Sequence, residues 1–326
     1  MPTVACGQRE ERIMKSFKAL GAALISVAML AGLGACGTTD EPDKAAGSAK
    51  SPSASSHPAP YDVSGIRKDE RIAAMVPQSV AADGKFTVGM ETTYAPGEFV
   101  DEDGKTPIGF DVDLSNALAK VMGLKPEMAS ASFDAIIPAI GSKYDAGISS
   151  FTITKEREQA VDFVTSFKAG TAFAVQKGNP KHLKADDLCG SKVGVQTGTM
   201  EEQGADKLGK ACKAQGRKPI EVQSYKLQTD AATAVMTGKI DVFYADSQVT
   251  GYAIKQTGGK LEQLGKDSDV VLQGIAIKKG DTRMVDATQN AMQKLIDDGT
   301  YGKIMDHWGV KSGAVDKAEV NPAVEG

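Results

Sequence analysis

The stretch Gly109-Phe-Asp-Val-Asp-Leu-Ser-Asn-Ala-Leu-Ala-Lys-Val-Met122 decides the class of fold. Its apolar residues Leu114, Leu118 and Val121 recur at helical spacing, and two aspartates stand in the first turn, where negative charge favours the helix dipole. Upstream, Lys85-Phe-Thr-Val-Gly-Met90 is short and rich in β-forming residues. A strand followed by a helix is the repeating unit of α/β folds.

The same alternation continues downstream. Ser132 is predicted to cap a helix over Phe133–Ile140, Tyr144–Ser149 has the composition of a strand, and Thr154 opens a further helix. After Gly178-Asn-Pro180 a second series begins. Its predicted strands are Lys192–Gln196, Ile220–Ser224 and Ile240–Tyr244, and its predicted helices start near Thr199, Gln228 and Ser247. The predicted elements of the C-terminal region are a helix over Thr282–Asp298 and the segment Tyr301–Trp308.

Strands separated by helices predict parallel sheets, and two such series predict two lobes. The expected crossovers between the lobes are Thr171–Gln176 and Val270–Ile277. Because ligands of open α/β sheets bind at the carboxyl ends of strands, we expect the site in the cleft between the lobes. The expected organisation is a leader at 1–35, a tether and extension at 36–83, lobe 1 at 84–173 and 270–313, lobe 2 at 174–269, and a tail at 314–326.

Composition excludes several classes of function. The chain has 326 residues and a net charge of −4, so it lacks the basic excess that a nucleic-acid partner requires. His57, His182 and His307 lie far apart, so no metal site is expected. The sequence contains no G-x-S-x-G elbow, no phosphate-binding P-loop and no H-E-x-x-H helix, so neither an enzyme nor a cofactor is expected.

The N-terminus is predicted to be a secretory signal. An apolar run over 19–35 follows two lysines and is short for a membrane span, and Met14 is a better signal start than Met1. The run ends in Leu33-Gly-Ala-Cys36, which resembles the lipobox of bacterial lipoproteins and implies a lipid on Cys36. An uncleaved anchor is the alternative. The Ser-, Ala- and Pro-rich residues 37–60 indicate a flexible tether.

Cys189 and Cys212 are the two cysteines left for the folded part of an exported chain. In an oxidising compartment an even pair favours a disulfide. Two buried free thiols are the alternative.

Gly109–Met122 resembles the signature of the family 3 extracellular solute-binding proteins, which are the polar amino-acid receptors of ABC importers. Further segments resemble that family in the family's order over residues 84–311: Tyr94–Phe99, Phe133–Pro138, Ser149–Arg157, Val193–Thr199, Gly238–Asp241, Tyr244–Asp246, and Asp298–Tyr301 with Trp308. The resemblance implies a two-lobed α/β periplasmic-binding-protein fold of type II, a monomer with its ligand in the interlobe cleft.

By the same resemblance, Arg157 binds the carboxylate of an amino acid and Asp246 its ammonium group, one from each lobe. Arg157 offers a planar fork that suits a carboxylate. Additional donors are implied at Ser149, Ser150, Thr152 and Thr199. The residues implied at the side-chain end of the cleft are Glu91, Tyr94, Phe133, Gln196 and Glu201. An acid at Glu91 repels acidic ligands, which favours a basic or neutral polar amino acid.

Structural roles are the alternative for each of these residues. Arg157 could be a surface helix residue paired with a nearby carboxylate, and Asp246 could simply cap the helix that follows it. Ser149 and Ser150 could be ordinary loop serines.

The sequence therefore predicts a lipid-anchored, extracytoplasmic receptor that delivers a free amino acid to the permease subunits of an ABC importer. An exported enzyme on the same fold, such as a dehydratase, and a solute sensor uncoupled from transport are the competing hypotheses.

Overall fold

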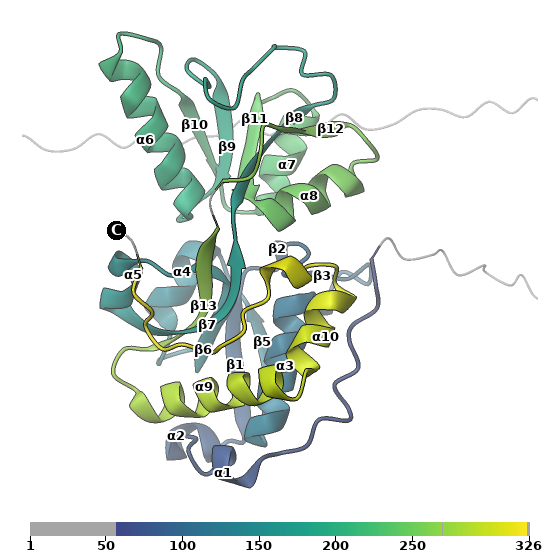
Figure 1. The fold of residues 1–326 in the computed structure, drawn as a ribbon, viewed down its shortest axis with the longest axis vertical. Coiled ribbons are helices and arrows are strands. Elements are labelled where there is room, and N and C mark those ends of the chain that lie inside the picture. Colours follow the sequence, from purple (N-terminus) through teal and green to yellow (C-terminus); the bar gives the residue numbers. More distant parts are fainter. Residues whose placement is uncertain (1–56, 269, 325–326) are drawn as a thin grey trace, which may run out of the picture. The chain divides into compact units, whose positions relative to one another are not determined.

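The computed structural model describes residues 57–268 and 270–324, and they form two lobes that each contain a five-stranded sheet (Figure 1). In lobe 1 the strand order is β5 (Lys125–Ser130), β1 (Lys85–Met90), β6 (Ala146–Thr152), β13 (Val271–Lys278) and β7 (Val161–Ala169). In lobe 2 it is β10 (Glu221–Tyr225), β9 (Lys192–Gln196), β11 (Val242–Asp246), β8 (Thr171–Gln176) and β12 (Leu261–Leu264). A small sheet in lobe 1 comprises β2 (Thr93–Tyr94), β3 (Glu98–Val100) and β4 (Pro107–Ile108).

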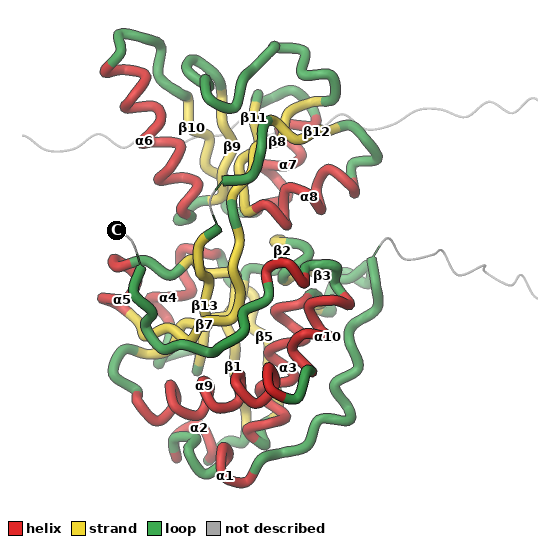
Figure 2. Tube along the Cα trace, viewed as in Figure 1, coloured by secondary structure: helices red, strands yellow, loops and turns green. Residues whose placement is uncertain are grey.

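Helices cover both sheets (Figure 2). Lobe 1 carries α1 (Glu70–Ala73), α2 (Gln78–Ala81), α3 (Phe110–Met122), α4 (Phe133–Ala139), α5 (Lys155–Ala160), α9 (Thr282–Asp297), α10 (Thr300–His307) and a 3₁₀ turn at Lys311–Gly313. Lobe 2 carries α6 (Met200–Ala214), α7 (Gln228–Met236) and α8 (Ser247–Gln256). No helix within the described residues is long and apolar enough to cross a membrane.

The two-lobed α/β architecture agrees with the prediction, but the prediction of purely parallel sheets is wrong. In lobe 1, β13 runs antiparallel to β6 and β7, and in lobe 2, β8 runs antiparallel to β11 and β12. These antiparallel strands are the ones that the chain enters on arriving from the other lobe. A strand arriving from the opposite lobe enters its sheet from the edge that faces the cleft, so its direction is reversed.

The chain crosses between the lobes at Gly170 and returns between β12 and β13. The expected crossover Thr171–Gln176 therefore lies wholly in the sheet of lobe 2, and the change of lobe falls three residues before the expected 173/174 boundary. The two crossings touch, because Ser268 N donates to Thr171 O at 2.8 Å and a Cβ on Gly170 would lie 2.5 Å from Ser268 O.

Both ends of the described chain pack on lobe 1. The segment before α1 runs along α10 (Figure 1), where Tyr61 N and Trp308 Nε1 both donate to Asp113 Oδ2, at 2.8 and 2.7 Å. Residues 314–326 were expected to be a tail, yet Val315 and Ala318 are buried in the core of lobe 1. The segment is held there because its backbone bonds to that of β7. The predictions for the leader, Cys36 and most of the tether lie outside the described residues.

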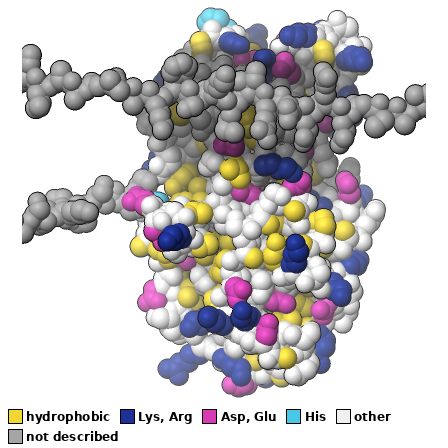
Figure 3. All heavy atoms as spheres, turned by 180° about the vertical axis from the view of Figure 1, so that it is seen from behind, with side chains coloured by type: hydrophobic (Ala, Val, Ile, Leu, Met, Phe, Trp, Pro, Cys, Tyr) yellow, Lys and Arg dark blue, Asp and Glu magenta, His cyan; other side chains and the backbone are white. Residues whose placement is uncertain are grey.

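Cys189 and Cys212 form the predicted disulfide, with Cα atoms 5.6 Å apart, and tie the start of β9 to α6. The prediction that Ser132 caps α4 is half right, because Ser132 holds the N-cap position but its side chain makes no capping hydrogen bond. On the face seen in Figure 3, lysines and arginines alternate with acidic side chains over lobe 1.

Gly109 allows α3 to begin against a neighbouring turn. Its φ of +128° lies in a region that side chains avoid, and a Cβ would stand 2.1 Å from Gly97 O. The helix that follows buries Leu114 and Leu118 completely.

We expect Gly109→Ala to lower the free energy of unfolding by more than about 3 kcal/mol, because backbone strain and a backbone clash add together. Gly104→Ala is the matched control: its φ is +70° but its Cβ would meet no atom within 4 Å. It should cost only about 1–2 kcal/mol. Urea unfolding of both variants measures the difference, and equal losses would contradict this role for the close approach.

Candidate ligand-binding site

The eleven residues implied by the sequence lie on the edges of the two lobes that face each other. Lobe 1 contributes Glu91, Tyr94, Phe133, Ser149, Ser150, Thr152 and Arg157, from the residue after β1 and from β2, α4, β6 and α5. Lobe 2 contributes Gln196, Thr199, Glu201 and Asp246, from the carboxyl ends of β9 and β11 and the start of α6. The convergence follows because β1 in the sheet of lobe 1 and the parallel strands β9 and β11 in the sheet of lobe 2 all end at the cleft.

Arg157 lies between the lobes. Its Nη1 donates to Thr152 O at 2.7 Å in lobe 1, and its Nη2 donates to Gly198 O at 3.1 Å in lobe 2. The guanidinium also lies 5.4 Å from the centre of the Phe133 ring. Arg157 is thus half-buried and held by both lobes, which argues against the alternative of a solvated surface residue.

Asp246 is buried and joined to lobe 1 from two sides. Its Oδ2 accepts from Tyr94 Oη at 2.8 Å and from Gln273 Nε2 at 2.8 Å. Asp246 does hold the N-cap position of α8, but its side chain makes no capping hydrogen bond, so capping is not its role. Burial raises the pKa of Asp246 to about 6, while the Tyr94 and Gln273 donors oppose that rise.

Glu91 and Gln196 connect the lobes at a second point. Gln196 Nε2 donates to Glu91 Oε2 at 2.7 Å, and the Thr93 hydroxyl contacts both oxygens of the same carboxylate at 2.8 and 2.9 Å. The Thr93 oxygen in turn accepts from Gln228 N of lobe 2 at 2.9 Å. Burial raises the pKa of Glu91 despite these donors.

Glu201 is 4% exposed, in the first turn of α6. Burial and then the nearby charge of Asp246 raise the pKa of Glu201 to about 8, and the charge of Arg157 only partly offsets this. Arg157 therefore interacts electrostatically with two buried carboxyl groups of lobe 2, those of Glu201 and Asp246.

The hydroxyls of Ser149, Ser150 and Thr199 already have protein partners, and Thr152 contributes its backbone carbonyl to Arg157. Ser149 Oγ donates to Glu98 Oε1 at 2.5 Å, and Ser150 Oγ donates to Asp111 Oδ2 at 3.1 Å. Thr199 Oγ1 donates to Gln196 O at 2.8 Å and caps α6. These three hydroxyls thus shape the protein around the site.

Several residues of this region escaped the sequence analysis. Gln273 donates to the carboxylate of Asp246, and Thr93 donates to that of Glu91. Lys226 Nζ of lobe 2 lies 2.5 Å from Asp134 Oδ2 of lobe 1. Gln273 carried a usable signal, because it is the single polar side chain in the otherwise apolar run Val270–Ile277. Within residues 57–268 and 270–324, no group of three or more His, Cys, Asp or Glu side chains could hold a metal ion.

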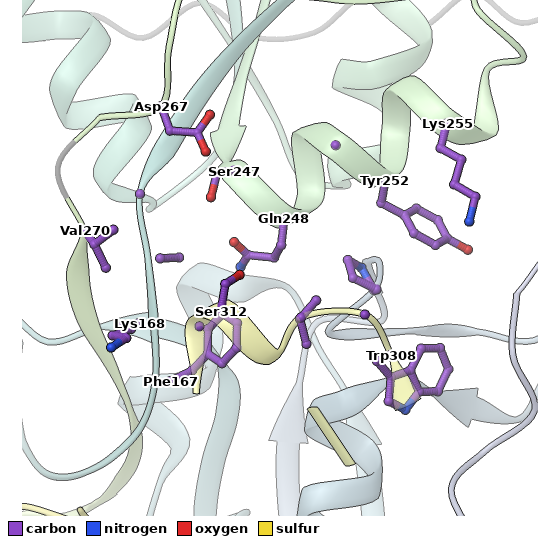
Figure 4. Close-up of a pocket in the computed structure, with 17 residues that line it drawn as sticks. Phe167, Lys168, Ser247, Gln248, Tyr252, Lys255, Asp267, Val270, Trp308 and Ser312 are labelled. Atoms are coloured by element: carbon purple, nitrogen blue, oxygen red, sulfur yellow. The ribbon is translucent and has the colours of Figure 1, made fainter. Parts of the chain in front are cut away.

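A cavity of about 980 Å³ opens elsewhere between the lobes, beside the crossing strands (Figure 4). Phe167, Tyr252 and Trp308 line it, together with Lys168 and Lys255. None of the eleven residues lines this cavity. We place the candidate site at Arg157 and Asp246, because a hydrogen-bonded cation and a buried carboxyl on opposite lobes suit a zwitterion, whereas the large cavity offers lysines without a buried carboxylate.

The comparisons with known proteins agree with this geometry. Residues 86–311 match the model of the bacterial extracellular solute-binding proteins, family 3. The chain belongs to this family. The match confirms the resemblance stated from the sequence and nearly coincides with its expected limits.

Relatives of this family 3 protein include the arginine-binding protein ArgT of Corynebacterium glutamicum, which is 34% identical over 252 residues, 77% of this chain and 82% of that protein. A solved structure of an ancestral arginine-binding protein bound to arginine is 37% identical, has a TM-score of 0.64, and aligns over 69% of this chain and 98% of its own. The ancestral amino acid-binding protein AncCDT-1, a precursor of cyclohexadienyl dehydratase, is 32% identical with a TM-score of 0.64, over 71% of this chain and 98% of its own.

In this family 3 protein we expect Tyr94→Phe to lower the free energy of unfolding by about 2 kcal/mol at pH 8, because it removes a hydrogen bond to an ionised carboxylate. At pH 5 the loss should be smaller, because Asp246, with a pKa of about 6, is then mostly protonated. Urea unfolding at the two pH values measures this. Tyr144→Phe is the control, since the Tyr144 hydroxyl makes no hydrogen bond to any described residue; a pH-independent loss in Tyr94→Phe would contradict the assignment.

Proposed function

We propose that this protein is the extracytoplasmic receptor of an ABC importer for a cationic amino acid, with arginine as the first candidate. The observation that carries the proposal is the imbalance of buried charge at the cleft. Among the described residues, Glu91, Glu201 and Asp246 bring three buried carboxyl groups to the cleft and Arg157 brings one cation. Leaving buried charge unpaired is costly, and a carboxyl such as Glu201 then keeps its proton instead. Arginine, lysine or ornithine brings one net positive charge and reduces that imbalance, whereas glutamate or aspartate would increase it.

The two charged groups common to all amino acids are assigned to opposite lobes. Arg157 binds the carboxylate through its planar fork, and Asp246 accepts from the ammonium group. Tyr94 and Gln273 hold the Asp246 carboxylate in place for this contact.

The side-chain end of the ligand is assigned to Glu91, Gln196 and Glu201. Gln196 Oε1 and Gln273 Oε1 are buried and have no hydrogen-bond partner among the described residues. Each belongs to an amide whose nitrogen bonds a carboxylate of the site. A ligand with many N–H donors, such as a guanidinium, satisfies acceptors of this kind, and this favours arginine over neutral polar amino acids.

Closure of the lobes links binding to transport in this proposal. A ligand that touches Arg157 and Asp246 stabilises the form in which both lobes meet, and the permease recognises that form. The direct contacts of Glu91 with Gln196 and of Asp134 with Lys226 support such a form. We further propose that the chain is exported, acts as a monomer, and is anchored through a lipid on Cys36.

The first test is a thermal-shift screen of residues 37–326, oxidised, against the twenty amino acids, ornithine, citrulline and cystine. A ligand at about 1,000 times its dissociation constant stabilises by roughly 4 kcal/mol, which corresponds to several degrees of melting temperature. We expect arginine, lysine or ornithine to give the largest shift and glutamate none. No shift with any amino acid would reject the proposal.

Variants then separate the assigned roles. Arg157→Ala is expected to abolish the shift while leaving the far-ultraviolet circular dichroism unchanged. Asp246→Ala should weaken arginine far more than its des-amino analogue, and an equal loss for both ligands would remove Asp246 from the ammonium site.

Because the pKa of Glu201 is raised, we expect that binding of a cationic ligand releases a proton from this residue. With a pKa of about 8, Glu201 is mostly protonated at pH 7, and a cation beside it favours the ionised form. Protons therefore compete with the ligand, so affinity should rise between about pH 6 and pH 8. Titration calorimetry in two buffers of different ionisation enthalpy measures the released proton. Glu201→Gln should remove most of the buffer dependence, and a wild type without buffer dependence would contradict this role.

A dehydratase is the second candidate, and Glu201 is the observation that favours it. A buried carboxylic acid that keeps its proton near pH 7 can act as a general acid. The test is turnover of arogenate or prephenate by the wild type and by Glu201→Gln. Turnover lost in the variant would establish this activity, and no turnover in either would exclude it.

A further inference from the structure

A second group of buried carboxyls lies behind the proposed site, in lobe 1. Glu98 of β3 is completely buried and Asp111 of α3 is 2% exposed, and the two side chains contact each other. Neither has a role in the proposed binding of an amino acid. Buried acidic side chains are rare and need partners, so the pair requires an explanation.

The pair is joined to the strand end that carries the site. Ser149 Oγ donates to Glu98 Oε1 at 2.5 Å and accepts from Glu91 N at 3.0 Å. Ser150 donates to Asp111 Oδ2 through both its N and its Oγ, each at 3.1 Å. These bonds hold Ser150 at φ +49°, a left-handed conformation that is uncommon for a residue other than glycine.

The second carboxyl oxygen of Glu98, Oε2, indicates whether Glu98 is protonated. Glu98 Oε2 is buried and has no donor among the described residues. Its neighbour Asp111 is also a carboxyl group, so two ionised carboxylates would present acceptors to each other without a hydrogen between them. One proton, carried by Glu98 and donated to Asp111, satisfies both groups.

We propose that Glu98 and Asp111 share one proton and that this singly protonated pair is a positioning device for the ligand site. The pair fixes Ser149 and Ser150, and two residues later the Thr152 carbonyl holds Arg157. Loss of the proton would place two negative charges in contact and release this strand end. The link to Arg157 rests on the proposed function, whereas the shared proton does not.

The electrostatic surroundings favour one proton over none. Glu91 faces Glu98, Asp246 acts on Asp111, and the Tyr301 hydroxyl of α10 lies within the influence of Asp111. Burial raises the pKa of Glu98 well above its usual range, and the charge of Asp111 raises it further. Burial also raises the pKa of Asp111, to about 6, so at pH 7 the proton resides on Glu98.

Glu98→Gln is the sharp test, because its amide can accept from Ser149 and donate to Asp111 without a titratable proton. A carboxyl that keeps its proton on folding costs stability as the pH rises above its unfolded pKa, and the glutamine variant lacks that cost. We therefore expect the melting temperature of Glu98→Gln to exceed that of the wild type by a margin that grows from pH 5 to pH 8. The infrared carbonyl band of a protonated carboxylic acid should lose intensity in the same variant at pH 7.

The control is Glu102→Gln, an exposed acid near β3, which should change neither measurement. A margin that is constant with pH, or an unchanged infrared band, would overturn the shared proton. Both readouts use the protein without any amino acid, so they remain decisive if the screen finds no ligand.

The positioning role is tested through affinity. Glu98→Leu removes the acceptor of Ser149 and the donor to Asp111, and we expect it to weaken the binding of arginine at least tenfold at pH 7. Wild-type affinity in Glu98→Leu would overturn the positioning role while leaving the proposed receptor intact. A wild type that binds no amino acid would instead reject the proposed function.

Discussion

The arrangement of both lobes depends on the buried carboxylate of Asp246. Lobe 2 supplies the carboxylate, and lobe 1 supplies two donors to it, Tyr94 from β2 and Gln273 from β13. A buried negative charge must be hydrogen-bonded, and here the donors can reach it only when the two lobes meet. Arg157 of lobe 1 also reaches lobe 2, where it donates to the carbonyl of Gly198. The cleft is therefore defined by charges that neither lobe satisfies alone.

The elements that followed simple periodicity were predicted well from the sequence. β1 and β9 have the predicted limits, and α3 fills the stretch Gly109–Met122 from its second residue. Thr171–Gln176 was expected to cross between the lobes and is instead strand β8 of lobe 2. In the two large sheets the missed strands, β5, β7 and β12, lie at sheet edges, two of them paired only with strands distant in sequence. The small sheet of β2, β3 and β4 was missed as well. The mixed direction of the sheets was also missed, because direction depends on how the chain returns between lobes and not on local pattern.

The candidate site was predictable as a set of positions but not as a network. Family resemblance placed Arg157 and Asp246 at facing edges of the lobes, where the structure brings them together. It did not reveal that Ser149 and Ser150 use their hydroxyls on Glu98 and Asp111. Such pairings join residues about 40 to 50 positions apart, and no spacing rule in a single sequence encodes them. The hydrogen bond from Gln273 to Asp246 was not predicted for the same reason, although a polar side chain within an apolar strand is unusual.

Both described ends of the chain pack on lobe 1, through Tyr61 on Asp113 at one end and Val320 beside β7 at the other. Within residues 57–268 and 270–324, the chain passes between the lobes at Gly170 and after Ser268. Lobe 1 is thus the lobe to which both ends are attached, and lobe 2 carries neither end of the described chain. A pull on either end of the described chain would act first on lobe 1, and it would reach lobe 2 through these two crossings and the contacts across the cleft.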